Sequence, residues 1–149
     1  MFTRPSTAVL LIAHGSRHAP ANDDLRRVAE RVAESATHPI VEPAFLELAS
    51  PDIAAAGARC VELGAGRVLM IPYFLSAGVH LLRDLTAARD GLIARHPGVE
   101  FRLGPPLGPD PLLERLVVER IDQLDGEGPG PEFAPSATMA ATYAPMGDH

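Results

Sequence analysis

The sequence contains no lysine, no tryptophan and a single cysteine, and these shortages exclude several classes of protein. With Cys60 alone, no disulfide framework can form within the chain, which fits a reducing compartment. Cys60 lies in an apolar-periodic stretch, so we expect it in the core. The 13 basic residues are all arginines and face 19 acidic residues, giving a formal net charge of −6. This balance argues against a nucleic-acid partner.

Long apolar runs and several familiar motifs are also missing. The apolar run at residues 8–12 is too short to cross a membrane and leads directly into polar residues, so we expect a cytoplasmic protein without a membrane partner. There is no phosphate-binding G-x-x-x-x-G-K-[ST], no C-x-x-C, and no second glycine after "HGSR" to make a nucleophile elbow. We therefore expect no nucleotide and no organic cofactor.

The sequence instead alternates between two hydrophobic periods. The continuous apolar run at 7–13 predicts a strand buried on both faces, and residues 22–35 place apolar side chains at helical spacing. The same patterns predict further strands at 39–48, 67–74 and 99–104 and helices at 50–66, 81–96 and 110–124. This alternation predicts an α/β domain with a parallel four-stranded sheet and helices on both faces.

Local signals place the ends of these elements. Pro43 predicts that its strand lies at an edge or carries a bulge. Asn22, Ser50 and Asp110 are expected to cap the three helices that follow them. Asp23 and Asp24 would then lie in a positive first turn, Pro51 and Pro111 would take first helical positions, and Gly64 would end the second helix.

Residues 125–149 differ from the rest of the chain. They contain four prolines and four glycines and no basic residue. We therefore divide the chain into a domain at 1–124 and a flexible acidic extension at 125–149. Docking of the extension through Phe133, Met139 and Tyr143 is the alternative.

Two histidines follow strands that should end at the same edge of the sheet. His14 follows the first strand and His80 the third, and ligands of parallel sheets bind beyond the carboxyl ends of the strands. Two imidazoles facing one cleft can bind a transition metal, and a neutral imidazole can accept a proton. Glu47 and Ser50 belong to the same rim. Four interpretations of Glu47 are open: a third metal ligand, a partner of a metal ligand, a proton acceptor, or an ordinary solvated carboxylate.

Small and basic residues surround these histidines. The loop before His80 is small around Ser76, Ala77 and Gly78, which lets a flat ligand approach the backbone, or simply connects a strand to a helix. Arg17 and Arg83 are suited to ligand carboxylates, although Arg83 and Asp84 also fit an ordinary surface ion pair.

Three segments together resemble a known family. "LLIAHGSR", "FLELASPDI" and "IPYFLSAGVHLLRDL" are similar to the short sirohydrochlorin chelatases of the CbiX/SirB type, and the resemblance runs from about Val9 to Leu124. It implies a lyase with a chelatase-like, flavodoxin-like three-layer fold. Such an enzyme inserts Co²⁺, Fe²⁺ or Ni²⁺ into a modified tetrapyrrole of cobalamin or siroheme biosynthesis, without ATP.

The resemblance also implies roles for individual residues. His14 and His80 match the catalytic, metal-binding histidines, and Glu47 matches a recurrent acidic position that would complete the metal ligands. Ser50 stands where some relatives carry an acidic residue, so its contact with substrate is in doubt. The residues expected to contact the tetrapyrrole are Ser16, Arg17, Ser50, Leu75, Ser76, Ala77, Gly78, Val79 and Arg83. Longer members carry two such halves, which suggests a homodimer here.

Two other functions fit the same residues. A metal or tetrapyrrole carrier would keep the fold and the histidine pair without turnover. Alternatively, the chain is a subunit that works with a partner docked on the 125–149 extension. The choice of metal is not encoded in two histidines, since metal supply and intrinsic affinity decide it.

Overall fold

The computed structural model describes residues 6–35 and 37–126. Its elements in chain order are β1 (Ser6–Ala13), α1 (Ala19–Ser35), β2 (Ile40–Phe45), α2 (Ile53–Glu62), β3 (Ala65–Pro72), α3 (Val79–Arg95), β4 (Glu100–Leu103) and α4 (Pro111–Asp125). The expectation of a flexible extension lies almost wholly outside the described residues. No helix of the described ranges is both long and apolar enough to cross a membrane.

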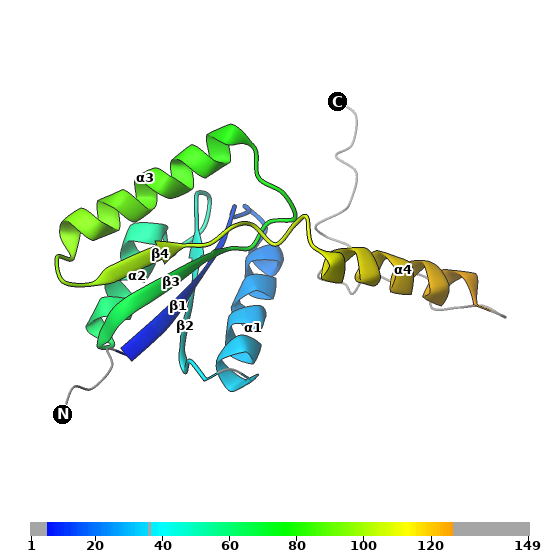
Figure 1. Ribbon diagram of the computed structural model, residues 1–149, viewed down its shortest axis with the longest axis horizontal. Helices are drawn as coiled ribbons and strands as arrows, with labels where there is room; N and C mark the ends of the chain where they lie inside the picture. Colours follow the sequence, from blue (N-terminus) through cyan, green and yellow to red (C-terminus); the bar gives the residue numbers. More distant parts are fainter. Residues whose placement is uncertain (1–5, 36, 127–149) are drawn as a thin grey trace.

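The four strands form one parallel sheet in the order β2-β1-β3-β4, as the alternating pattern predicts (Figure 1). β1 lies between β2 and β3, and its residues Ala8, Leu10 and Ile12 are fully buried. Pro43 lies in β2, an edge strand, which confirms the expectation drawn from its missing N–H. All four strands therefore deliver their carboxyl ends to one rim.

Helices cover both faces of the sheet, which confirms the predicted three layers. On one face α2 and α3 pack over the strands, with Ile53, Cys60 and Leu92 buried among β1 and β3 side chains. On the other face, Leu25 and Ala29 of α1 pack against the side chains of β1 and β2. α4 is present where the sequence predicts it, but it covers neither face (Figure 1).

Two of the predicted helix caps are wrong. α1 begins at Ala19, so Asn22 lies inside the helix, and Asp23 and Asp24 pair with Arg26 and Arg27 instead of occupying the first turn. Residues 19–21 already form the first turn of α1, and the side-chain amide of Asn22 bonds the backbone of Ser16 instead.

The cap of α2 is Asp52, not Ser50. Its carboxylate accepts a hydrogen bond of 2.8 Å from the backbone N–H of Ala55. Pro51 does not take the first helical position, because α2 begins at Ile53. The carbonyl of Pro51 instead accepts from the N–H of Phe45 at 2.9 Å, which holds this segment beside the end of β2. Asp110 caps α4 as predicted, accepting from the N–H of Leu112 at 2.8 Å.

These contacts predict unequal losses of stability for two neighbouring substitutions. Asp52→Ala removes the cap of α2 and should lower the free energy of unfolding by about 1 kcal/mol. Ser50→Ala should change it by less than about 0.5 kcal/mol, since only its backbone carbonyl is bonded. Urea denaturation of both variants measures the difference. A larger loss for Ser50→Ala than for Asp52→Ala would reverse the assignment.

Candidate functional site

A cavity of about 440 Å³ opens at the carboxyl rim of the sheet. It is lined by residues that follow β1, residues that follow β2 and the first turns of α3. The structure thus brings His14, Glu47 and His80 to one place. The lining is His14, Leu46, Glu47, His80, Leu81 and Asp84.

His14 and Glu47 form the first wall of this cavity. His14 Nε2 lies 2.8 Å from Glu47 Oε1, and both side chains are more than half exposed. Their backbones are joined as well, because the N–H of Glu47 donates to the carbonyl of His14 at 3.0 Å. β2 ends at Phe45, three residues earlier than predicted, so Glu47 belongs to a loop held against the segment after β1. The pair can hold a cation or a proton between an imidazole and a carboxylate.

Gly15 is required for this close approach. Its φ is +97°, and a Cβ built there would overlap the carbonyl oxygen of Glu47 and lie 3.3 Å from Cβ of Phe45. Any side chain at this position would therefore push apart the two loops that carry His14 and Glu47. It would also strain the backbone, because residues other than glycine rarely adopt a positive φ.

His80 and Asp84 form the opposite wall. α3 begins at Val79, two residues before the predicted start, so His80 lies in the first turn of the helix. Asp84 follows at i+4, a spacing that puts both side chains on one helical face. The sequence contains this signal, but the only role that we considered for Asp84 was an ordinary surface ion pair with Arg83, as the alternative to a substrate contact of Arg83.

The two walls do not form a closed metal cage. Within residues 6–35 and 37–126, no group of three or more histidine, cysteine, aspartate or glutamate side chains is close enough to hold an ion. The predicted ligands His14, Glu47 and His80 share the cavity without being drawn together as a three-ligand set. Such an open arrangement suits a metal that is bound weakly and passed on.

The residues of the predicted tetrapyrrole loop do not all line one hollow. Leu75, 71% exposed, lines an apolar groove beside α4. Val79 and Arg83 line a shallow hollow on another side of α3, with Leu82 and Thr86. Ser76 and Gly78 are exposed between them, Ala77 is half-buried, and Gly78 is the N-cap position of α3.

The remaining predicted contacts surround the rim. Arg17 is exposed beside His14, whereas Ser16 is half-buried and its Oγ accepts from the N–H of His18. The side chain of Ser50 is not part of the cavity lining; its carbonyl accepts from Arg26.

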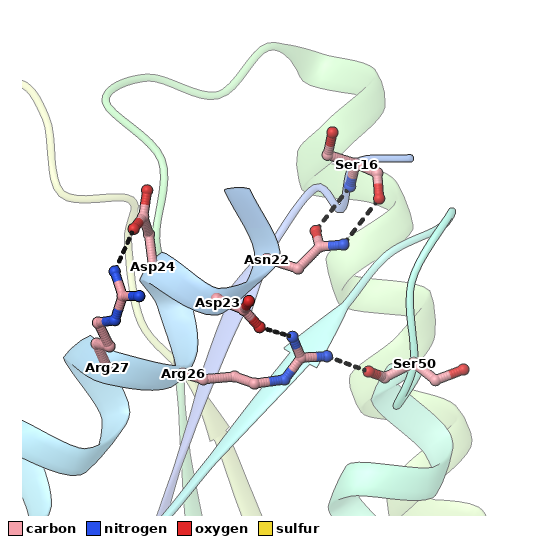
Figure 2. Close-up of polar contacts among 7 residues, drawn as sticks. All are labelled: Ser16, Asn22, Asp23, Asp24, Arg26, Arg27 and Ser50. Carbon is pink, nitrogen blue, oxygen red and sulfur yellow. Dashed lines mark hydrogen bonds and ion pairs between the residues drawn. The ribbon is translucent and has the colours of Figure 1, made fainter. Parts of the chain in front are cut away.

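α1 ties both rim loops to the body of the domain (Figure 2). Asn22 is 7% exposed, and its side-chain amide accepts from the N–H of Ser16 at 2.9 Å and donates to the carbonyl of Ser16 at 2.8 Å. One turn later, Arg26 donates to the carbonyl of Ser50 at 3.0 Å and lies over the ring of Phe45. Asn22 therefore acts as a clamp that holds the loop carrying His14. The sequence had instead predicted that Asn22 caps the helix.

Cys60 lies in the core, as predicted. It is fully buried on the inner face of α2, and burial together with the nearby Glu42 carboxylate raises the pKa of its thiol to about 12. A thiol with that pKa is a poor metal ligand and nucleophile at neutral pH.

Comparison with known proteins identifies the family to which this chain is related. Residues 8–124 match the model of the CbiX family. The chain is 36% identical over 113 residues to the chloroplastic sirohydrochlorin ferrochelatase of Arabidopsis thaliana, covering 76% of this chain and 50% of that protein. It is 34% identical over 122 residues to a sirohydrochlorin cobaltochelatase of Priestia megaterium, covering 81% and 40%.

The solved structure of a CbiX protein from Marinobacter aquaeolei VT8 has the same fold. Its TM-score is 0.68 at 32% identity, and the match covers 78% of this chain and 94% of that one. By contrast, the chain spans half or less of the length of the first two relatives. Because the family match runs from residue 8 to residue 124 and includes both walls of the rim cavity, the chain belongs to the CbiX family.

Proposed function

We propose that this protein is a sirohydrochlorin chelatase that inserts a divalent metal into a modified tetrapyrrole. The observation that carries the proposal is the single rim cavity that receives His14, Glu47 and His80 from three separate chain segments of a CbiX-family domain. Relatives carry the names of iron and cobalt chelatases, so Co²⁺ and Fe²⁺ are the first metals to test and Ni²⁺ the next. The reaction needs no nucleotide and no organic cofactor.

Metal insertion is an exchange of one divalent ion for two pyrrole protons. The ion must shed its water, and both protons must leave the centre of the ring. His14, whose Nε2 lies 2.8 Å from Glu47 Oε1, is placed to accept the two protons in turn and to release each to solvent, to which its side chain is more than half exposed. His80 faces the same cavity and shares the incoming metal. The open ligand set binds the ion without trapping it, as a thiolate cage would.

The tetrapyrrole is placed against the same rim. Its flat face would lie along residues Leu75 to Val79, with Ser16 at the His14 turn. Its carboxylates would meet Arg17 and Arg83, whose guanidinium groups pair well with carboxylates. Ser50 has the weakest support among the proposed contacts, because Arg26 holds its loop from the other side.

Catalysis of this kind depends on position, since no covalent chemistry is required of the protein. The two hydrogen bonds from Asn22 to the backbone of Ser16 fix the loop that carries His14 and Arg17. We further propose that the protein acts in the cytoplasm as a homodimer whose paired rims complete the tetrapyrrole cleft.

The histidines provide the direct test. His14→Ala and His80→Ala should each lower kcat/KM for metallation of sirohydrochlorin by about 100-fold. The reaction is measured by absorbance with Co²⁺, Fe²⁺ and Ni²⁺ in turn. His18→Ala is the matched control, because His18 is exposed in the same loop but does not line the cavity. It should keep near-wild-type rates. Unchanged rates in both rim variants would refute the proposal, and wild-type protein that binds metal and ring without turnover would identify a carrier.

Asn22→Leu tests the clamp at nearly constant side-chain size. It leaves the N–H and carbonyl of Ser16 without partners, so the free energy of unfolding should fall by about 1–3 kcal/mol. At a temperature where the variant is folded, kcat should fall about tenfold or more because His14 is no longer held. Asn22→Asp, which can still accept from the Ser16 N–H, should lie between. Wild-type kcat in folded Asn22→Leu would exclude a positioning role.

A further inference from the structure

Leu48 has a backbone conformation that leucine rarely adopts. It lies directly after Glu47 in the loop between β2 and α2, and its φ is +63°. Within residues 6–35 and 37–126, it is the only residue other than glycine with a positive φ. A Cβ crowds the backbone in this left-handed region, so glycine is the usual residue there. Leu48 therefore keeps a large side chain at a position where glycine would be less strained.

The packing of the loop does not account for this side chain. Leu46 packs against the core cluster under α2 and α3, and Ala49 packs against the cluster under α1. Between them, Leu48 stays 52% exposed. An exposed leucine is ordinary by itself, but one that is also held in a strained conformation indicates a function other than folding.

Hydrogen bonds hold the loop on both sides of Leu48. Before it, the N–H of Glu47 donates to the carbonyl of His14 at 3.0 Å. After it, Arg26 of α1 donates to the carbonyl of Ser50 at 3.0 Å (Figure 2). The backbone at Leu48 is therefore fixed before any ligand arrives, so little further ordering is required when its side chain makes a contact.

Leu48 borders the rim cavity without lining it. Its neighbour Glu47 lines the cavity, and on the opposite wall Val79, which is 64% exposed, directly precedes the lining residue His80. Each wall thus carries an exposed aliphatic side chain next to a residue of the proposed metal site. A tetrapyrrole is wider than the ion at its centre, so a ring centred on this site must extend onto the residues that border the cavity.

We infer that Leu48 contacts the tetrapyrrole, packing on the apolar periphery of the ring at the wall opposite Val79. This inference rests on the proposed function and adds a binding residue to the wall that carries Glu47. Arg17 and Arg83 would pair with the carboxylates of the ring, whereas Leu48 would cover apolar surface. Leu48 would thus contribute to the affinity for the macrocycle and not to the affinity for the metal.

Leu48→Gly removes the side chain and keeps the turn. The KM for sirohydrochlorin should rise about tenfold while kcat stays within about twofold of wild type, because the lost contact is made equally before and during metal insertion. The dissociation constant of the metal-free ring, measured by absorbance titration, should rise by the same factor. Binding of Co²⁺ without the ring should not change. The midpoint of urea unfolding should stay near that of wild type, since glycine accommodates a positive φ.

Two further variants control for size and place. Leu48→Met keeps a long apolar side chain and should restore a KM close to that of wild type. Leu63→Gly makes the same substitution at an exposed leucine that precedes β3, at the opposite end of the sheet. It should leave the KM for sirohydrochlorin unchanged.

Four results would overturn the inference. A wild-type KM in Leu48→Gly, with normal turnover by wild-type protein, would exclude the contact and leave the chelatase proposal intact. A lower kcat at unchanged KM would show that Leu48 only positions Glu47. A change of mass in light scattering at unchanged affinity for the ring would assign the side chain to a contact between chains. Wild-type protein that neither binds nor metallates sirohydrochlorin would overturn both this inference and the proposed function.

Discussion

The parallel register of β1 with its two neighbours is the constraint on which the rest of the structure depends. Ile12 of β1 aligns with Ala44 of β2 and Pro72 of β3, so three strands end at nearly the same level. The pairing continues past the strands, where Tyr73 donates to Ile12 and Glu47 donates to His14. Residues 33 positions apart in sequence, 14 and 47, thereby become partners. The proposed metal site is assembled by this shared rim and the start of α3 alone.

The rim loops would nevertheless be loose without α1. Asn22 holds the loop after β1 and Arg26 holds the loop after β2, and both come from adjacent turns of one helix that is packed on β1 and β2 (Figure 2). The buried amide costs desolvation that its two hydrogen bonds offset. The same helix thus contributes a core face through Leu25 and a loop anchor through Asn22. The site gains fixed positions for His14 and Glu47 while their side chains stay open to solvent.

Much of this could be predicted from sequence, because strand and helix periods are local properties. The apolar runs predicted all four strands, and the rule that ligands bind beyond parallel strand ends selected His14, Glu47 and His80. Contacts between elements could not be predicted in the same way. Asn22 and Ser50 have good cap chemistry, but the Ser16 backbone bonds the amide of Asn22, and Asp52 caps α2 in place of Ser50. The failure of α4 to cover its own sheet is likewise invisible in its periodicity, which shows an apolar face but not what the face meets.

The central proposal is that two imidazoles, one from the loop after β1 and one from the first turn of α3, bind one ion at the rim. The most direct measurement is X-ray absorption at the cobalt edge on protein loaded with Co²⁺ in the absence of tetrapyrrole. The account predicts a first shell that contains imidazole nitrogen from both His14 and His80, with one imidazole lost in each single alanine variant. A shell of water oxygen alone, or a shell that neither substitution changes, would contradict it.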